Sequence, residues 1–276
     1  MKTVVITGAT SGLGNLLVRE FVYKGYTVFA GYRNVKLKKE LIKISENVIP
    51  FRIDMSKGWT ISDAVKFISE KTDKIDTLIN AAGCVYAGPM ECLSVDKIRE
   101  QFEINTFAHL ELSQGLFPKL QGGKIINISS MASFGIFPFV APYCASKRAL
   151  DILFNSMQIE CGNNIKVISI KPGVIKTPLW DKSIELNKEA LEDIEKYEKE
   201  LEFLMKNAKK NNRKGLEPKV VVEKILKIED LEAPKASYTI GLDAKIAEII
   251  SHLPQNLINI LVKKSLEIKM GKSIQS

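Results

Sequence analysis

Short apolar segments alternate with amphipathic segments along most of this chain, and this alternation constrains the fold more than any other feature. The apolar segments are rich in β-branched residues, as expected for buried strands, and lie at 3–7, 26–32, 48–54, 77–80, 123–130, 166–170 and 237–241. Helical patterns follow most of them, at 15–24, 60–71, 94–121, from Tyr143 onward and at 218–228. A repeated strand-then-helix order predicts an α/β fold with a doubly wound, parallel, Rossmann-type sheet.

The length of the chain bears on the number of domains. Its 276 residues suffice for one large α/β domain or for two small ones. We expect a single Rossmann-type domain over residues 1–276. Within it, periodic apolar positions in the charged region 183–214 predict one or two amphipathic helices, and we predict a C-terminal helical extension at about 246–276.

A glycine-rich turn joins the first predicted strand to the first predicted helix. It reads Gly8-Ala9-Thr10-Ser11-Gly12-Leu13-Gly14. Glycines allow the backbone to approach a pyrophosphate closely, and a helix N-terminus attracts its negative charge. We therefore expect a dinucleotide to bind here, the alternative being a glycine-rich turn without a ligand. The predicted binding residues are Gly8, Ser11, Gly12, Leu13 and Gly14.

The end of the second predicted strand bears on the choice of cofactor. NAD-binding sites usually carry an acidic residue here that holds the ribose 2′-hydroxyl, and residues 31–34 include none. Arg33 instead offers a guanidinium group suited to the 2′-phosphate of NADP, and Ser11 could add a hydroxyl. We favour NADP(H) over NAD(H), the alternative being that Arg33 is an ordinary surface arginine.

Tyr143 and Lys147 lie four residues apart in a helical pattern. Positions i and i+4 share one face of a helix, so the phenol and the ammonium group point into the same space. A nearby positive charge favours phenolate, and we expect Lys147 to lower the pKa of Tyr143 from its free value of about 10. Tyr143 could then exchange a proton with an alcohol or a carbonyl. Taken alone, the pair is also compatible with ordinary residues on one helix face.

Charge and histidine content argue against two kinds of site. The chain has 40 Lys and Arg against 32 Asp and Glu, a net charge of +8, but the excess is spread out. We therefore expect a solvated basic surface and no nucleic-acid binding. The only histidines are His109 and His252, so we expect neither a histidine metal site nor a histidine-based catalytic triad.

Cysteine spacing and apolar runs bear on the compartment. The four cysteines form no C-x-x-C pair, and we interpret them as free thiols in a reducing compartment. The N-terminus shows no signal-peptide pattern, and no apolar run approaches the roughly 20 residues that span a bilayer. These features predict a cytoplasmic location.

Several short motifs follow one another in a fixed order over about residues 2–180. They are Thr7-Gly8…Gly12-Leu13-Gly14, Asp54, Asn80-Ala81-Ala82-Gly83, Asn105, Ser130, Tyr143…Lys147 and Pro172-Gly173…Thr177. In this order and spacing the chain resembles the short-chain dehydrogenases/reductases. It departs from the family pattern at Ala81, where the motif has a second asparagine.

The resemblance implies a catalytic role for four residues. Tyr143 would be the general acid in carbonyl reduction and the general base in alcohol oxidation. Lys147 would lower the pKa of Tyr143 and hold the nicotinamide ribose hydroxyls. Ser130 would hydrogen-bond the substrate oxygen, and we choose it over the adjacent Ser129 because its spacing to Tyr143 is the one usual in the family. Asn105 would hold Lys147 and a water molecule in a proton relay.

The resemblance also implies positions along the cofactor. Asp54 would bind near the adenine, and Asn80 with Gly83 would line the cofactor. The nicotinamide end would be framed by Pro172, Gly173 and Thr177. Because the catalytic residues are all present, we favour an enzyme over a nucleotide-sensing or scaffold protein on the same fold.

The back third carries the clues to the substrate. The resemblance implies a single oxidoreductase domain in which residues of about 178–217 form a helical substrate flap. Residues 177–183 and 237–245 resemble those of 17β-hydroxysteroid and retinol dehydrogenases, which implies a bulky apolar alcohol or ketone. A broad-specificity carbonyl reductase is the alternative. The loop 131–141 holds three phenylalanines, which form either an apolar pocket or a packed loop. Further candidate apolar contacts, each equally compatible with core packing, are Leu179, Trp180, Phe203 and Met205.

The tail at 253–270 mixes Leu and Ile with Lys263, Lys264 and Lys269. Such a helix could lie on a membrane surface, or it could pack on the core or on a partner subunit. We favour packing over membrane contact. Related enzymes are commonly dimers or tetramers, so the resemblance also implies a homo-oligomer.

Overall fold

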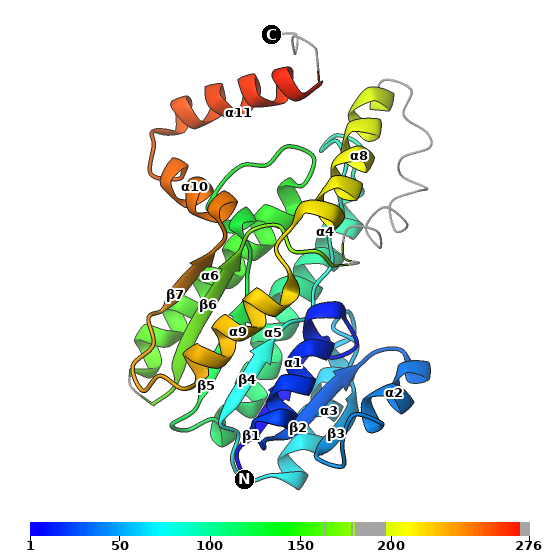
Figure 1. Cartoon of the computed structure of the whole chain (residues 1–276), viewed down its shortest axis with the longest axis vertical. Coiled ribbons are helices and arrows are strands. Elements are labelled where there is room, and N and C mark those ends of the chain that lie inside the picture. The colour runs from blue at the N-terminus through cyan, green and yellow to red at the C-terminus, as the bar shows by residue number, and fades with distance from the viewer. Residues whose placement is uncertain (163, 178, 180–196, 271–276) are drawn as a thin grey trace.

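Seven parallel strands of the described residues form one sheet, in the order β3-β2-β1-β4-β5-β6-β7 (Figure 1). The computed structural model describes residues 1–162, 164–177, 179 and 197–270. The chain builds one half of the sheet outward from β1 and the other half outward from β4, so the strand order reverses between these two strands. The strands are β1 (Thr3–Ile6), β2 (Thr27–Tyr32), β3 (Val48–Arg52), β4 (Thr77–Asn80), β5 (Lys124–Ile128), β6 (Lys166–Pro172) and β7 (Ser237–Ile240).

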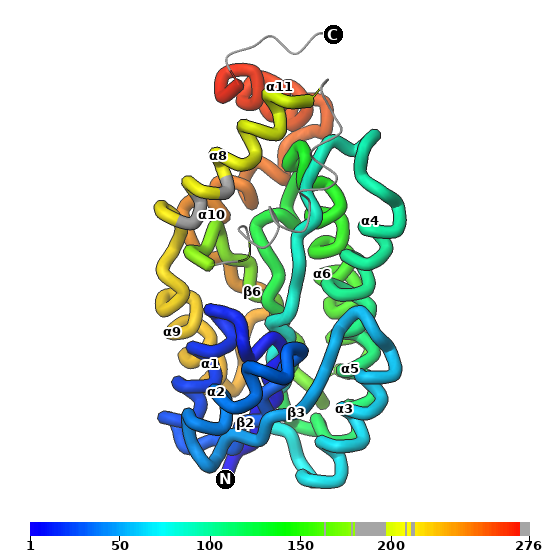
Figure 2. Tube along the Cα trace, turned by 90° about the vertical axis from the view of Figure 1, so that its right-hand side faces the viewer, coloured from blue at the N-terminus to red at the C-terminus, as the bar shows by residue number. Residues whose placement is uncertain are grey.

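Helices cover both faces of the sheet and give the protein three layers (Figure 2). One face packs against α1 (Gly12–Tyr23), α2 (Lys38–Ile42) and α9 (Pro218–Glu229). The other face packs against α3 (Gly58–Lys71), α5 (Ala108–Leu116) and α6 (Ala141–Cys161). Because the sheet is covered on both sides, its strands are apolar on both faces, which accounts for their nearly continuous β-branched sequences. The predicted doubly wound fold is confirmed.

Two local departures from the predicted elements have clear causes. The first helix begins at Gly12 instead of Asn15, because the Ser11 hydroxyl caps it by accepting a hydrogen bond of 3.1 Å from the Gly14 N–H. The segment predicted as one or two helices at 94–121 contains α4 (Val95–Phe102), a π-helical turn (Glu103–Phe107) and α5. Such turns are rare and are often found at functional sites.

The loops after β1 and β4 meet at the point where the strand order reverses. The Thr7 hydroxyl accepts hydrogen bonds of 3.0 and 3.1 Å from the N–H groups of Ala81 and Ala82. The carboxyl ends of all seven strands lie at this same edge of the sheet, and open α/β sheets bind their ligands there.

Three further helices lie beyond the carboxyl edge of the sheet: α8 (Glu198–Lys214), α10 (Leu242–Ile250) and α11 (Gln255–Met270) (Figure 1). α10 packs against the short helix η4 (Met131–Phe134), and α11 contacts α8. The predicted extension at 246–276 is helical through Met270, and its last six residues lie outside the described part. Of the predicted flap at 178–217, the structure describes residue 179 and residues 197–217.

The core between the sheet and α6 depends on large buried side chains, and Phe154 is one of the largest. We expect Phe154→Ala to lower the free energy of unfolding by about 3–5 kcal/mol, because it leaves a cavity in a closely packed core. Ile159 is on the same helix but 82% exposed, so Ile159→Ala should change stability by about 0.5 kcal/mol or less. Urea unfolding of the two variants measures both effects, and equal losses would contradict this description of the core.

Candidate active site

One cavity of about 850 Å³ lies at the carboxyl edge of the sheet. Its walls come from the loops after β1 to β6 and from α6, α8, α10 and α11. It brings together most of the residues predicted to bind cofactor or substrate. These are Gly8, Ser11, Gly12, Leu13, Arg33, Asp54, Gly83, Ser130, Tyr143, Lys147, Pro172, Gly173 and Thr177.

The glycine loop at one end of the cavity fits the phosphate groups of a dinucleotide. Gly8 has a φ of 65°, and a Cβ there would lie 3.0 Å from the backbone of Ala82. Gly12 and Leu13 line the cavity at the start of α1, where backbone N–H groups have no acceptor within the helix. The free N–H groups and the helix dipole both favour a negatively charged ligand group.

Gly14 has a packing role and does not line the cavity. A Cβ on Gly14 would lie 2.1 Å from the carbonyl oxygen of Gly8, so only glycine allows α1 to begin this close to the loop. The predicted contact of Gly14 with the cofactor stays a prediction.

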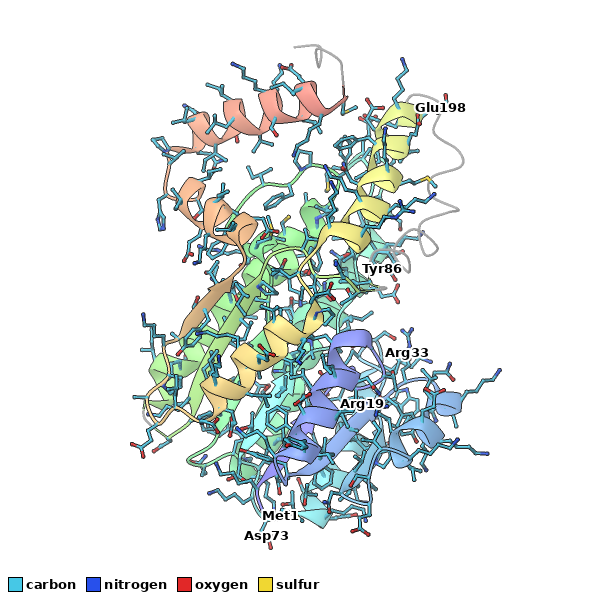
Figure 3. The ribbon with its side chains drawn as sticks, in the orientation of Figure 1. Met1, Arg19, Arg33, Asp73, Tyr86 and Glu198 are labelled. Carbon is cyan, nitrogen blue, oxygen red and sulfur yellow. The ribbon has the colours of Figure 1, made fainter. Side chains whose placement is uncertain are left out.

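Arg33 and Asp54 lie in the cavity wall next to the glycine loop. Arg33 follows β2 and is exposed, and its guanidinium group is available to a ligand in the cavity (Figure 3). Asp54 is held in place by Ser56, whose backbone N–H and hydroxyl donate to Asp54 Oδ1 at 3.1 and 2.8 Å. A phosphate near Arg33 and an adenosine moiety near Asp54 fit this pair of side chains.

Tyr143 and Lys147 lie in the first turns of α6, on the face that lines the cavity. Pro142 occupies the first turn, where its missing N–H costs no hydrogen bond. Tyr143 is 7% exposed and Lys147 is 4% exposed. The Lys147 Nζ donates to the Ile128 carbonyl oxygen at 2.8 Å and lies 6.0 Å from the centre of the Tyr143 ring. The predicted shared face is confirmed.

Burial changes the acidity of both groups. It raises the pKa of Tyr143 to about 12, and a hydrogen bond with Ser130 lowers it only in part. Burial also lowers the pKa of Lys147 to about 8, although the Asp151 carboxylate acts in the opposite direction. Our prediction of a lowered pKa for Tyr143 is wrong for this structure, because desolvation outweighs the stabilisation of the phenolate. Tyr143 is therefore a neutral phenol at pH 7.

A buried ion pair continues the same face of α6. Asp151 lies one turn beyond Lys147, and its Oδ2 is 3.1 Å from the Nζ of Lys171 on β6. Lys171 also lies 4.6 Å from the centre of the Phe134 ring. Because both charges are almost completely buried, losing either partner would leave an uncompensated charge in the interior. The pair fixes α6 relative to β6 directly behind Lys147, and our sequence analysis missed it.

Ser129 and Ser130 both reach the cavity, and their contacts differ. The Ser130 hydroxyl accepts a hydrogen bond of 3.1 Å from the Ala132 N–H and interacts with Tyr143. The Ser129 hydroxyl is buried and has no hydrogen-bond partner among the described residues. Ser130 is thus in contact with Tyr143, and its predicted place next to the reacting oxygen stays a prediction.

Asn80 and Asn105 are fully buried and do not line the cavity. The Asn80 Nδ2 donates to Asn127 Oδ1 at 2.8 Å, so Asn80 joins β4 to β5. Its predicted place along the cofactor stays a prediction. Asn105 instead holds the loop after β4: it accepts from the Cys84 N–H and donates to the Cys84 carbonyl, both at 2.9 Å. It also donates to the Ser146 hydroxyl at 3.0 Å, and no bond from its side chain to Lys147 is present among the described residues.

Asp243 is a cavity residue that our sequence analysis did not single out. It lies in the first turn of α10 and accepts a hydrogen bond of 2.9 Å from the Val174 N–H. A Cβ on Gly173 would lie 2.0 Å from its carboxylate, so Gly173 is needed for this contact. Asp243 thus joins α10 to the loop that follows β6.

The opposite end of the cavity is mainly apolar. Phe137 from the loop 131–141 and Leu179 and Phe203 from the back third line it, as predicted for an apolar pocket. Met205 does not line it, and Trp180 lies outside the described residues. The rest of this end is formed by α10 and α11, so the predicted C-terminal extension packs over the cavity.

Comparison with known proteins places this geometry in a family. A family model described as short chain dehydrogenase matches residues 2–189. The chain belongs to the short-chain dehydrogenase family. The match includes the glycine loop, Ser130, Tyr143 and Lys147. The resemblance predicted from the sequence is confirmed, and members of this family are NAD(P)-dependent oxidoreductases that act on small molecules.

Individual relatives support the same conclusion. A probable short-chain type dehydrogenase/reductase, VdlC of Helicobacter pylori, is 32% identical over 246 residues, 88% of this chain and 89% of its own. An NADPH-dependent 3-dehydrocapnine reductase of Ornithobacterium rhinotracheale is 32% identical over 198 residues, 66% of this chain and 69% of its own. Among solved structures, an alcohol dehydrogenase of Thermococcus sibiricus complexed with 5-hydroxy-NADP shares the fold. It has a TM-score of 0.69 and 22% identity over 87% of this chain and 96% of its own.

Two further features of this dehydrogenase concern membranes and metals. None of the helices over residues 1–162, 164–177 and 197–270 has the length and apolarity needed to cross a membrane. The same residues include no group of three or more His, Cys, Asp and Glu side chains arranged to hold a metal ion.

The burial of Lys147 predicts a pH-dependent stability. Its pKa is about 8 in the folded chain and 10.5 in the unfolded chain, so between these values the unfolded chain binds more protons. This residue therefore makes the stability rise with pH. From pH 7 to about 9.5, the free energy of unfolding of the wild type should increase by about 2 kcal/mol relative to that of Lys147→Met. Urea unfolding at both pH values measures the difference, and parallel pH profiles would contradict the lowered pKa.

Proposed function

We propose that this protein is an NADP(H)-dependent oxidoreductase that interconverts a carbonyl and a primary or secondary alcohol on a bulky apolar substrate. The observation that carries the proposal is the single cavity at the carboxyl edge. Tyr143, Ser130 and Lys147 open into it between a glycine loop and an apolar end. A charged cofactor and an apolar substrate could therefore meet beside a proton donor.

The proposed cofactor rests on the residues at the glycine-loop end of the cavity. When bound, NADP(H) supplies or accepts the hydride. Arg33 would hold the 2′-phosphate, the start of α1 would hold the pyrophosphate, and Asp54 would bind near the adenine. Pro172, Gly173 and Thr177 would frame the nicotinamide end. An NADPH-dependent relative and a structural neighbour complexed with 5-hydroxy-NADP support NADP over NAD.

The proposed proton chemistry follows from the acidity and contacts of the catalytic side chains. Tyr143, with a pKa of about 12, holds its proton at pH 7 and would donate it to the carbonyl oxygen of a substrate. Ser130 would hydrogen-bond the same oxygen and stabilise the negative charge that develops there. The ammonium group of Lys147 would hold the ribose hydroxyls. Asn105 would act indirectly, because its side chain hydrogen-bonds the loop after β4 and the Ser146 hydroxyl and so holds both in place.

A broad-specificity carbonyl reductase is a second candidate function. The 850 Å³ cavity is open to molecules of several shapes, and the substrate class rests on its apolar end alone. We further propose that α8 belongs to a substrate flap within a single domain spanning residues 1–276. The expected dimer or tetramer and the expected cytoplasmic location stay predictions.

Removing the phenol hydroxyl tests the proton donor. We expect Tyr143→Phe to lower kcat/KM for ketone reduction by about 100-fold or more, because general acid catalysis is lost. NADPH affinity, measured by quenching of protein fluorescence, should not change. The matched control is Tyr23→Phe, since Tyr23 is 89% exposed and remote from the cavity. Turnover near the wild-type rate in Tyr143→Phe would refute this role.

A second substitution tests the cofactor. We expect Arg33→Ala to weaken NADPH binding by about 10- to 100-fold, because a charge-assisted hydrogen bond to the 2′-phosphate is lost. NADH, which lacks that phosphate, should bind equally well to the variant and the wild type. Arg19→Ala is the control, because Arg19 projects from α1 and hydrogen-bonds Asn15 on the same helix (Figure 3). Equal losses for the two cofactors would contradict the assignment of Arg33.

A further inference from the structure

A long helix, α11, lines the apolar end of the cavity, and the length of this end follows from the residues that the helix contributes. α11 contributes Ile258, Leu261, Val262, Ser265, Leu266 and Lys269 to the wall. These positions recur every three or four residues and therefore form one stripe along one helix face. At 1.5 Å per residue, the stripe from Ile258 to Lys269 runs for about 16 Å. We call the space next to this stripe the α11 channel.

Two other helices, α8 and α10, lie beyond the carboxyl edge of the sheet together with α11 (Figure 1). Both also line the cavity. α8 contributes Phe203, Leu204 and Asn207, and α10 contributes residues including Ile246 and Ile250. Most of these side chains are apolar. The polar residues of α8 and α11 that line the cavity are Asn207, Ser265 and Lys269. Only Lys269 is charged, and it is exposed, so these two helices provide no buried charge that could pair with a polar substrate.

The lining of the channel is only partly covered by protein. Of the residues of α11, all of which the structure describes, Ile258 alone is buried. Leu261 lines the cavity but remains 40% exposed, and Val262 and Leu266 are half-buried. When an apolar ligand covers apolar side chains that are exposed to water in a cavity, their removal from water stabilises the complex.

We infer that the α11 channel binds an extended hydrocarbon chain, which makes the substrate a long-chain aliphatic carbonyl or alcohol. This inference rests on the proposed function, because it assumes that the reacting carbon lies beside Tyr143 and Ser130 in the same cavity. The chain runs along the stripe from the buried end at Ile258 toward the exposed end at Lys269. A compact fused-ring molecule would cover only part of a channel of this length.

Direct binding tests the channel without relying on turnover. The probes are methyl ketones with alkyl chains of about four, eight, twelve and sixteen carbons, each competing with cis-parinaric acid, a fluorescent polyene fatty acid, for the full-length protein. Each buried methylene should tighten binding by about two- to fourfold until the chain fills the channel. Because the channel is about 16 Å long, affinity should stop rising near twelve carbons.

A pair of tryptophan variants tests the location of the chain. Val262 lies one helical turn beyond Ile258 within the stripe, so Val262→Trp should shorten the channel. Four residues of helix span about 6 Å, so the gain in affinity should then end near four or five carbons. Binding of the twelve-carbon ketone should weaken by about 10-fold or more. Ile260 is on the same helix but 62% exposed and does not line the cavity, so Ile260→Trp should leave the chain-length profile unchanged.

The outcomes separate this inference from the proposed function. Affinity that does not depend on chain length, or equal effects of the two tryptophan variants, would overturn the channel. So would a ketosteroid that binds more tightly than the twelve-carbon ketone. If Ile260→Trp alone altered sedimentation with vesicles of anionic phospholipid and neither variant altered ketone binding, α11 would be a membrane helix instead. Chain-length-dependent binding without any NADPH oxidation would support the channel and refute the proposed reaction.

Discussion

The hydroxyl group of Thr7 holds together the two loops on which the whole site depends. It accepts hydrogen bonds from the N–H groups of Ala81 and Ala82, and these bonds hold the loop after β1 against the loop after β4. Gly8 follows immediately and packs against Ala82 at a distance that leaves no room for a side chain. One side of this junction leads into the glycine loop and α1, and the other leads to Gly83, next to Asn105 and Lys147. The hydrogen bonds of Thr7 and the packing of Gly8 on Ala82 thus fix the cofactor end of the cavity relative to its catalytic end.

The catalytic end is unusual in how much charge it buries. Lys147, Asp151 and Lys171 are each less than a tenth exposed. Their attraction offsets part of the cost of removing three charges from water, but burying such groups rarely adds net stability. The buried charges instead fix the position of the Lys147 ammonium group. It donates a hydrogen bond to the Ile128 carbonyl, and the Asp151–Lys171 ion pair lies behind it, so it stays at the cavity wall.

Local sequence signals predicted the parts of the structure that are locally determined. β-branched segments predicted the strands, and the glycine spacing predicted the turn at Gly8–Gly14. The i, i+4 spacing predicted that Tyr143 and Lys147 share a face. The features that local signals did not predict depend on the surroundings. Spacing cannot show that burial outweighs a neighbouring charge at Tyr143, or that the Asn80 side chain hydrogen-bonds Asn127. Asp243 and the α11 stripe depend on contacts between distant segments, so no local pattern marks them.

The contact of Asp243 with the loop after β6 links substrate choice to cofactor geometry. The carboxylate of Asp243 contacts Gly173 and Val174 in this loop. Asp243 itself belongs to the first turn of α10, the helix that lines the apolar end of the cavity. A change that moves α10 outward to admit a wider molecule would also pull on the loop predicted to frame the nicotinamide. Relatives that evolve new substrates by this route would need compensating changes in that loop.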